Sequence, residues 1–299
     1  MKVTTLVGGV AFALSLIASG VNAETKGGAL ADTAASNNQL RIQEIRNATV
    51  KFTYADTTFL VDPMFAKKGA YPGFENTYRS HLRNPLVELP FSVNDVMDGV
   101  DAVIVTHTHL DHWDPAAQAL LPKNLPLFVQ NEADRNTILS QGFTDVRVLG
   151  ENTIFGNVKL SKTGGQHGTD KMFTNPSLAE FLGVAMGVVF EAPGYKTVYL
   201  AGDTIWRPEV DSTIKQFSPD VIVLNAGYAR VNDYDGAIIM GKEDVLRAVK
   251  VAPEAKVVAV HMDAINHMGQ NRKELRAFVK EKGIESHVSV PEDGAVLKF

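Results

Sequence analysis

The stretch from residue 107 to residue 112 constrains this chain more than any other part of its sequence. It reads His107-Thr-His109-Leu-Asp111-His112, which places three histidines and one aspartate within six residues. The apolar, β-branched residues 101–106 predict a buried strand that leads directly into it. Where a strand leaves the core, a tight turn can direct several side chains toward one point. Because imidazole and carboxylate are ligands that zinc prefers, we interpret the stretch as a metal site rather than a metal-free histidine loop.

Three more residues of the same ligand types occupy comparable places later in the chain. Asp203 lies in Gly202-Asp203-Thr204, directly after the apolar residues 197–201, and His261 follows the apolar residues 255–260. His167 lies in the glycine-rich segment 164–168. Taken singly, each would be a turn former, a helix cap or a structural histidine. Taken with residues 107–112, they predict a larger ligand set.

The first 23 residues have the layout of a secretory signal peptide. Lys2 supplies a positive start, residues 6–18 form an apolar run, and Val21-Asn22-Ala23 resembles a small-x-small cleavage site. The apolar run is too short for a comfortable membrane span, so we expect a cleaved signal rather than an uncleaved anchor. The mature protein is then expected to be exported, periplasmic or secreted, and not bound to a membrane.

The charge balance of the chain favours a small-molecule partner. It carries 29 basic and 34 acidic side chains, a net charge of −5 that becomes −6 once Lys2 is removed with the signal. This acidic balance argues against a nucleic-acid partner, which usually requires a basic surface. The chain has no cysteine, so it has neither disulfides nor thiolate ligands for a metal.

The hydrophobic pattern predicts one α/β domain. Residues 24–47 are interpreted as a flexible lead-in and residues 48–299 as the domain. Two strands at 50–54 and 58–61 precede a long Pro- and Gly-containing loop at 63–95. The rest alternates between further strands (101–106, 146–149, 158–162, 183–191, 197–201, 221–225 and 255–260) and helices (115–121, 133–141, 243–251 and 272–281). Such alternation in two halves is typical of a layered α/β domain.

The ordered series His107, His109, Asp111, His112, His167, Asp203 and His261 resembles the metal ligands of the metallo-β-lactamase superfamily. The resemblance covers residues 48–299 and is strongest to a lactonase-like branch related to ascorbate-6-phosphate lactonase and to uncharacterised metal-dependent hydrolases. It implies a four-layer αββα sandwich with the metal site at one edge.

The resemblance also implies a role for each matched residue. His107, His109 and His167 would hold one divalent ion, Asp111, His112 and His261 would hold a second, and Asp203 would bridge the two. Zinc suits these ligands, and manganese or iron would fit as well. A hydroxide held between two such ions is a strong nucleophile near neutral pH, and two carboxylates offset only part of the metal charge, so an anionic substrate would be accommodated.

Proton transfer is the expected additional role of Asp111, beside the bridging water, and of His267, six residues after His261. A surface histidine at a helix start is the alternative for His267. Asn225 and Tyr228, after another apolar run, are weaker candidates for substrate contact than for a turn. Lys242 is a candidate for an acidic ligand, with a solvated lysine as the simpler account.

The sequence therefore predicts a binuclear metal-dependent hydrolase that cleaves a small ester or lactone. Fold-level likeness does not determine the substrate, so hydrolysis of phosphodiesters or nucleotides is the alternative. β-Lactam hydrolysis ranks third, because export fits it but the Asp203 motif does not. A non-catalytic periplasmic metal- or ligand-binding protein would be expected to have lost some of the seven ligands, and all seven are present.

Overall fold

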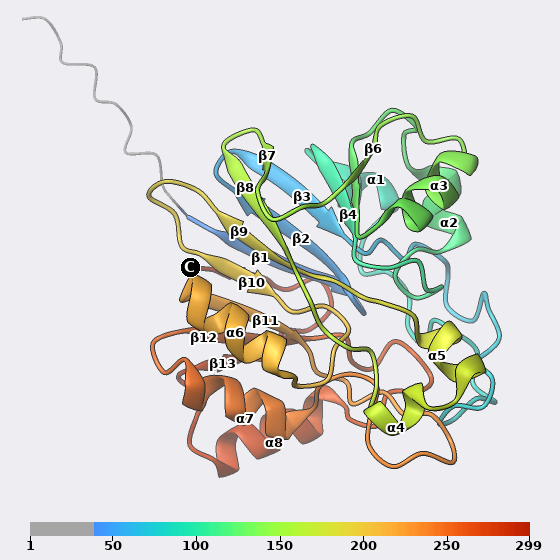
Figure 1. Cartoon of the computed structure of the whole chain (residues 1–299), viewed down its shortest axis with the longest axis vertical. Helices are drawn as coiled ribbons and strands as arrows, with labels where there is room; N and C mark the ends of the chain where they lie inside the picture. The colour runs from blue at the N-terminus through green and yellow to red at the C-terminus, as the bar shows by residue number, and fades with distance from the viewer. Residues whose placement is uncertain (1–38) are drawn as a thin grey trace, which may run out of the picture. The chain divides into compact units, whose positions relative to one another are not determined.

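A computed structural model describes residues 39–299 and shows two seven-stranded sheets (Figure 1). The first sheet has the order β14-β1-β2-β3-β4-β5-β6 and the second has the order β13-β12-β11-β10-β9-β8-β7. In each sheet an antiparallel part passes into a parallel part, at β3–β4 in the first and at β10–β11 in the second. The predicted signal peptide, residues 1–23, lies outside the described residues.

The strands of the first sheet are β1 (Arg41–Arg46), β2 (Thr49–Tyr54), β3 (Thr57–Val61), β4 (Ala102–Val105), β5 (Leu127–Val129), β6 (Val146–Val148) and β14 (Val296–Lys298). Those of the second are β7 (Thr153–Phe155), β8 (Val158–Thr163), β9 (Gly187–Glu191), β10 (Val198–Leu200), β11 (Val221–Asn225), β12 (Lys256–Val260) and β13 (Val288–Ser289). The central parallel strands β4 and β11 are buried at every residue, which explains their uninterrupted apolar sequences.

Helices cover the outer face of each sheet. The first sheet packs against α1 (Val93–Met97), α2 (Pro115–Leu120) and α3 (Glu132–Ser140), and the second against α6 (Pro208–Phe217), α7 (Lys242–Val251) and α8 (Arg272–Glu281). Two short helices, α4 (Asp170–Phe173) and α5 (Pro176–Leu182), connect β8 to β9. None of the helices within residues 39–299 has the length and apolarity that crossing a membrane requires.

Three apolar clusters define the layers. One joins the two sheets face to face, with Phe52, Phe59 and Phe190 in ring contact at its centre. The other two lie between each sheet and its helices. The order is thus helix, sheet, sheet, helix, which confirms the predicted four-layer αββα sandwich.

The N-terminal boundary of the fold differs from the prediction. Residues 41–46 form β1 between β2 and β14, so the lead-in predicted for residues 24–47 is wrong for this part, and the domain begins before residue 48. The sequence of β1 does not indicate a buried strand, because it contains Glu44 and Arg46. Charged residues are usually exposed, but both of these are buried. Glu44 pairs with Arg272, and Arg46 donates hydrogen bonds to three backbone carbonyls of the long loop.

Smaller differences concern where some of the later helices and strands begin and end. Helix α5 ends at Gly183, whose φ is +59°, so the strand predicted for 183–191 begins only at Gly187. Helix α6 and the short strands β7, β13 and β14 were not predicted, although Val210, Ile214 and Phe217 of α6 have the spacing of one helix face. By contrast, α8 has the predicted bounds, and Gly283 follows its C-cap with a φ of +65°.

Candidate metal centre

The polar side chains predicted to bind metal meet at one edge of the sandwich. Residues 106–114 follow β4 of the first sheet, whereas Asp203 follows β10 and His261 follows β12 of the second. His167 comes from the loop between β8 and α4. Because parallel strands place their carboxyl ends at one edge, the two sheets direct these residues toward the same place.

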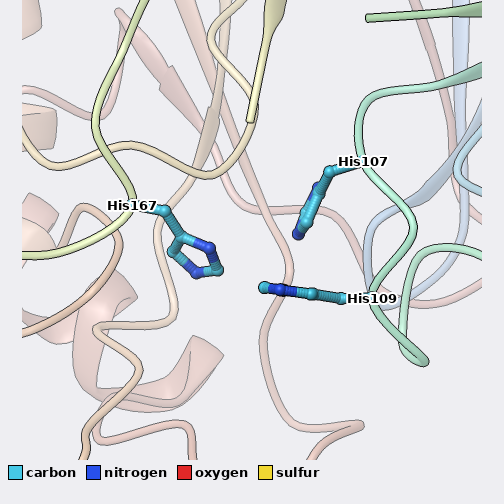
Figure 2. A group of neighbouring side chains, drawn as sticks. All are labelled: His107, His109 and His167. Carbon is cyan, nitrogen blue, oxygen red and sulfur yellow. The ribbon is translucent and has the colours of Figure 1, made fainter. Parts of the chain in front are cut away.

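His107, His109 and His167 form the first group of potential ligands (Figure 2). One ring nitrogen of each lies within 4.8 Å of the others. The two histidines of the 107–112 turn have ring centroids 4.4 Å apart, and His167 approaches them from the other half of the fold at 5.4 and 5.1 Å.

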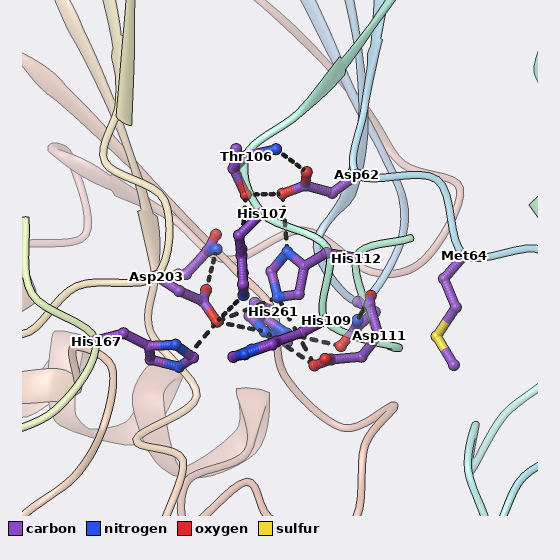
Figure 3. Close-up of polar contacts among 12 residues, drawn as sticks. Asp62, Met64, Thr106, His107, His109, Asp111, His112, His167, Asp203 and His261 are labelled. Atoms are coloured by element: carbon purple, nitrogen blue, oxygen red, sulfur yellow. Dashed lines mark hydrogen bonds and ion pairs between the residues drawn. The ribbon is translucent and has the colours of Figure 1, made fainter. Parts of the chain in front are cut away.

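Asp203 lies at the centre of the histidines (Figure 3). Its Oδ2 atom is 3.1 Å from Nε2 of His112 and 3.4 Å from Nε2 of His167. The same oxygen is 3.6 Å from Nε2 of His261 and 3.8 Å from Nε2 of His107. One carboxylate oxygen therefore faces four imidazoles from three segments of the chain.

Asp111, His112 and His261 form a second group. Oδ2 of Asp111 is 3.7 Å from Nε2 of His112 and 3.6 Å from Nε2 of His261. Because His112 also contacts Asp203, the two groups adjoin and share the Asp203 carboxylate. All seven predicted ligands are therefore brought together.

Several buried atoms in these groups lack hydrogen-bond partners. The Nε2 atoms of His107, His112, His167 and His261 are all in this state. Leaving such atoms unpaired inside a protein is costly, and they cluster around carboxylates instead of being dispersed. Divalent cations bound by neutral imidazoles and ionised carboxylates would satisfy them, so the residues present fit metal ions.

Hydrogen bonds on the far side of each ring set its tautomer. Nδ1 of His112 donates to Oδ2 of Asp62 at 2.8 Å, and Nδ1 of His261 donates to Oδ1 of Asn47 at 2.6 Å. Thr106 donates its hydroxyl to Asp62, which leaves its oxygen to accept from Nδ1 of His107 at 3.1 Å. In all three rings, Nε2 is consequently the nitrogen that faces Asp203 and is available to a cation.

Sequence reasoning missed Asp62, Asn47 and Thr106, and considered Asn225 only as a substrate contact. Asn225 donates to Oδ1 of Asp203 at 2.6 Å, which fixes the carboxylate with Oδ2 facing the histidines. Their position in the sequence could have revealed two of these residues. Asp62 follows an apolar strand and Asn225 ends one, just as Asp203 follows β10.

The electrostatics of the centre favour positive charge there. Burial lowers the pKa of His107 well below its usual value and lowers that of His167 to about 3, so both rings are neutral near pH 7. Burial alone would also lower the pKa of His112, but Asp203, Asp111 and Asp62 outweigh it and raise that pKa. The pKa of Asp203 is held well below its usual value, because His112 and His261 outweigh its burial.

Comparison with known proteins agrees with this geometry. A family model described as the beta-lactamase superfamily domain matches residues 57–262. The UPF0173 protein YddR of Bacillus subtilis is 46% identical over 260 residues, which cover 87% of this chain and 100% of YddR. The chain belongs to the metallo-β-lactamase superfamily. Within it, the chain falls in the UPF0173 family of metal-dependent hydrolases.

Two solved structures resemble the hydrolase over nearly their whole length. A possible metal-dependent hydrolase from Veillonella parvula is 52% identical with a TM-score of 0.85, covering 86% of this chain and 98% of that one. An isothiocyanate hydrolase from Delia radicum gut bacteria is 47% identical with a TM-score of 0.84, covering 87% and 99%. Both of these relatives are named as hydrolases, one of them as possibly metal-dependent.

The remaining sequence candidates divide into one that faces the centre and two that do not. His267 is buried, its ring packs edge-on against Phe74, and Asp111 and His261 both affect its pKa, so it lies beside the second group. Tyr228 and Lys242 instead line a separate cavity, and the Lys242 ammonium lies over the ring of Phe278. Lys242 is exposed at the first position of α7, which agrees with the simpler account of a solvated lysine at a helix start.

Proposed function

We propose that this hydrolase uses two metal ions to add water to a small substrate with an electrophilic carbon. The observation that carries the proposal is the position of Asp203, whose Oδ2 lies within 3.8 Å of four Nε2 atoms. We assign one ion to His107, His109 and His167, the other to Asp111, His112 and His261, and both to Asp203. When bound, divalent ions of this kind activate water and polarise the substrate.

The chain's own residues would prepare the site for that chemistry. Asp62, Asn47 and Thr106 hold three imidazoles in the tautomer that a cation requires. Asn225 prevents the Asp203 carboxylate from rotating. The nitrogen and carboxylate ligand set, without thiolate, suits zinc best, and manganese or iron is the alternative.

We assign proton transfer to Asp111 and hydrogen-bond donation to His267. Asp111 is buried and carries a lowered pKa because His112, His261 and His267 outweigh its desolvation, so it is ionised and can accept a proton from water. Burial lowers the pKa of His267 to about 4, so its ring is neutral near pH 7. A neutral imidazole at this position donates an N–H hydrogen bond to the substrate atom on which negative charge develops.

Isothiocyanates are the substrate class that we place first. The solved relative named an isothiocyanate hydrolase is 47% identical and covers 87% of this chain. In the reaction, water adds to the central carbon of R–N=C=S, nitrogen takes up the protons and the C–N bond breaks, which yields R–NH2 and carbonyl sulfide. Small esters and lactones present a similar electrophilic carbon and are second, and phosphodiesters are third.

A substrate panel tests this order. We expect the zinc-loaded protein to hydrolyse an alkyl isothiocyanate with a kcat/KM at least tenfold above that for a matched alkyl ester, a lactone or bis(p-nitrophenyl) phosphate. Substitution of Asp203 by alanine should remove all of these activities. Phosphodiester cleavage as the dominant activity would contradict the proposal, and metal binding without any hydrolysis would favour a binding protein.

We also infer export from residues 1–23. The inference rests on the positive start, the apolar run and the cleavage-type sequence Val21-Asn22-Ala23. Intact-mass measurement of the protein from its native cells should give a chain that begins at Glu24. A full-length chain starting at Met1 would contradict it.

A further inference from the structure

A cavity of about 610 Å³ lies between the long loop, helix α5 and the segment before α7. Its walls include the apolar side chains of Phe74, Leu110, Leu178, Phe181 and Val231. Polar groups of Asn76, Asn232 and Tyr234 also contribute. The lining contains no residue of the seven-ligand set, so the cavity is a neighbour of the metal centre and not part of it.

Three residues of the cavity lining adjoin the metal centre or His267 beside it. Leu110 lies in the chain between His109 and Asp111. The Phe181 ring stacks on the His109 ring at 5.4 Å with an interplanar angle of 17°, and the Phe181 carbonyl accepts a hydrogen bond from Nε2 of His109 at 2.8 Å. On the other side, Phe74 packs edge-on against His267 at 5.0 Å. A substrate whose reacting carbon is at the metals therefore has this cavity beside it.

The hydrogen bond from His109 also links helix α5 to the first metal group. Because Nε2 donates to the Phe181 carbonyl, Nδ1 is the nitrogen of His109 that presents a lone pair. Phe181 therefore both positions a candidate ligand and forms a wall of the cavity. Its side chain remains half-exposed, as expected for a wall that a ligand would cover.

The charges of the lining select against anions. Among the described residues that line the cavity, the charged ones are Glu75 and Asp233, both acidic, and no lysine or arginine accompanies them. A substrate carboxylate or phosphate placed here would lack a cationic partner and would face two carboxylates. The metal ions could attract an anion, but this cavity would repel it.

We propose that the cavity binds the uncharged, apolar group of the substrate, and that Leu178 and Phe181 of α5 supply the apolar surface that holds it. The inference rests on the proposed hydrolase function and adds the substrate class: neutral molecules with an alkyl or aryl tail. It differs from the expectation that an anionic substrate would be accommodated.

A homologous series of alkyl isothiocyanates, from methyl to hexyl, tests the proposal on the zinc-loaded enzyme. Each methylene that enters the cavity should raise kcat/KM by about fourfold. Leu178→Ala should reduce the hexyl-to-methyl ratio of kcat/KM by roughly five- to tenfold. The matched control is Leu120→Ala, because Leu120 is an exposed leucine on α2 that is not part of the cavity lining. It should leave the ratio unchanged.

Two outcomes of this series would overturn the proposal. One is a flat dependence on chain length in the wild-type enzyme, and the other is the same ratio in Leu178→Ala as in wild type. A 5-carboxypentyl isothiocyanate should also react at least tenfold more slowly than the hexyl compound, and equal or faster reaction of the acid would overturn the selection against anions.

Binding without reaction separates this inference from the proposed function. Titration of the zinc-loaded protein with 1-hexanol, followed by saturation-transfer NMR, should show binding that Leu178→Ala weakens at least fivefold and Leu120→Ala does not. If no isothiocyanate is hydrolysed but this pattern holds, the proposed activity fails and the cavity assignment stands. Absence of hexanol binding, or equal binding by both variants, would overturn the assignment.

Discussion

Asp62 holds His112 in place: Oδ2 of Asp62 accepts from Nδ1 of His112 at 2.8 Å, while both carboxylate oxygens accept from Thr106. Asp62 has a φ of +47°, an uncommon conformation that aspartate tolerates better than most residues. The contact gives His112 one tautomer and one orientation, with Nε2 toward Asp111 and Asp203. A residue outside the ligand series thus shapes both predicted ion positions.

Substitution of Asp62 by asparagine should weaken metal binding. Asparagine keeps the backbone conformation but loses the charge that supports His112, and changes of this kind cost roughly 10- to 100-fold in metal affinity. Competition with a fluorescent zinc chelator measures the loss. Asp56→Asn is the matched control, since exposed Asp56 also has a positive φ, of +61°. Equal zinc affinities in the two variants would contradict a role of Asp62 in metal binding.

Substitution of His267 should lower kcat but leave the shape of the kcat–pH profile unchanged. His267→Ala removes the N–H donor, and loss of one such donor typically costs roughly 10²–10³-fold in kcat. His267→Gln keeps an N–H and should retain part of the rate. Because the lowered pKa, about 4, leaves the ring neutral above that pH, the shape of the kcat profile between pH 6 and 8 should match wild type.

The control for His267 is the exposed His81→Ala, which should have wild-type kcat. Loss of an acidic or basic limb of the profile in His267→Gln would show instead that His267 transfers a proton near neutral pH.

The stability of the fold should depend on pH through Glu44. Burial raises the pKa of its carboxyl well above the usual value, although Arg272 opposes this. A raised folded-state pKa contributes stability below the unfolded-state pKa of about 4.3, and this contribution is lost as pH rises through the folded-state value. Glutamine does not titrate, so Glu44→Gln should not lose this stability as pH rises. Its free energy of unfolding should therefore vary less between pH 5 and pH 8 than that of wild type.

Urea unfolding of metal-loaded protein at several pH values measures this effect. The exposed Glu285→Gln should keep the wild-type slope. A Glu44→Gln variant with the wild-type pH dependence would contradict the assignment.

Removal of metal should destabilise the folded chain. An ion present at a thousandfold excess over its Kd contributes about 4 kcal/mol to the free energy of unfolding. For a domain of this size, 1 kcal/mol shifts Tm by about 2–4 °C, so EDTA should lower Tm by roughly 10 °C or more. Added zinc should restore it. Calorimetry that finds the same Tm with and without EDTA would contradict a metal centre.

Much of the centre could be predicted because its ligands occur where the sequence changes character. His107, Asp203 and His261 each follow an apolar run that can only be a buried strand, and strands of one sandwich end at a common edge. The pattern of apolar runs indicated a larger ligand set, and the resemblance to the metallo-β-lactamase superfamily completed it with His167, which lies in a glycine-rich loop. The helical bounds of α8 were equally clear, because Asn271 and Glu274 form a capping box and Gly283 follows its C-cap.

What the sequence hid were interactions between distant segments. Asn47 reaches His261 across 214 positions, and Phe181 reaches His109 across 72, so no local pattern reveals either pair. Strand β1 was hidden for the same reason, because the partner of buried Glu44 is 228 positions away. The cavity beside the centre is formed by helix α5 and by irregular segments around residues 72–77 and 231–234, whose arrangement depends on the packed fold.

The proposed sharing of two metal ions by Asp203 is tested most directly by the metal content of the purified chain. Inductively coupled plasma mass spectrometry of zinc-loaded protein after desalting should give two ions per chain, and Asp203→Ala should hold at most one and lose hydrolysis. One ion per chain in fully active wild-type protein, or an active Asp203→Ala variant that retains both ions, would contradict the account.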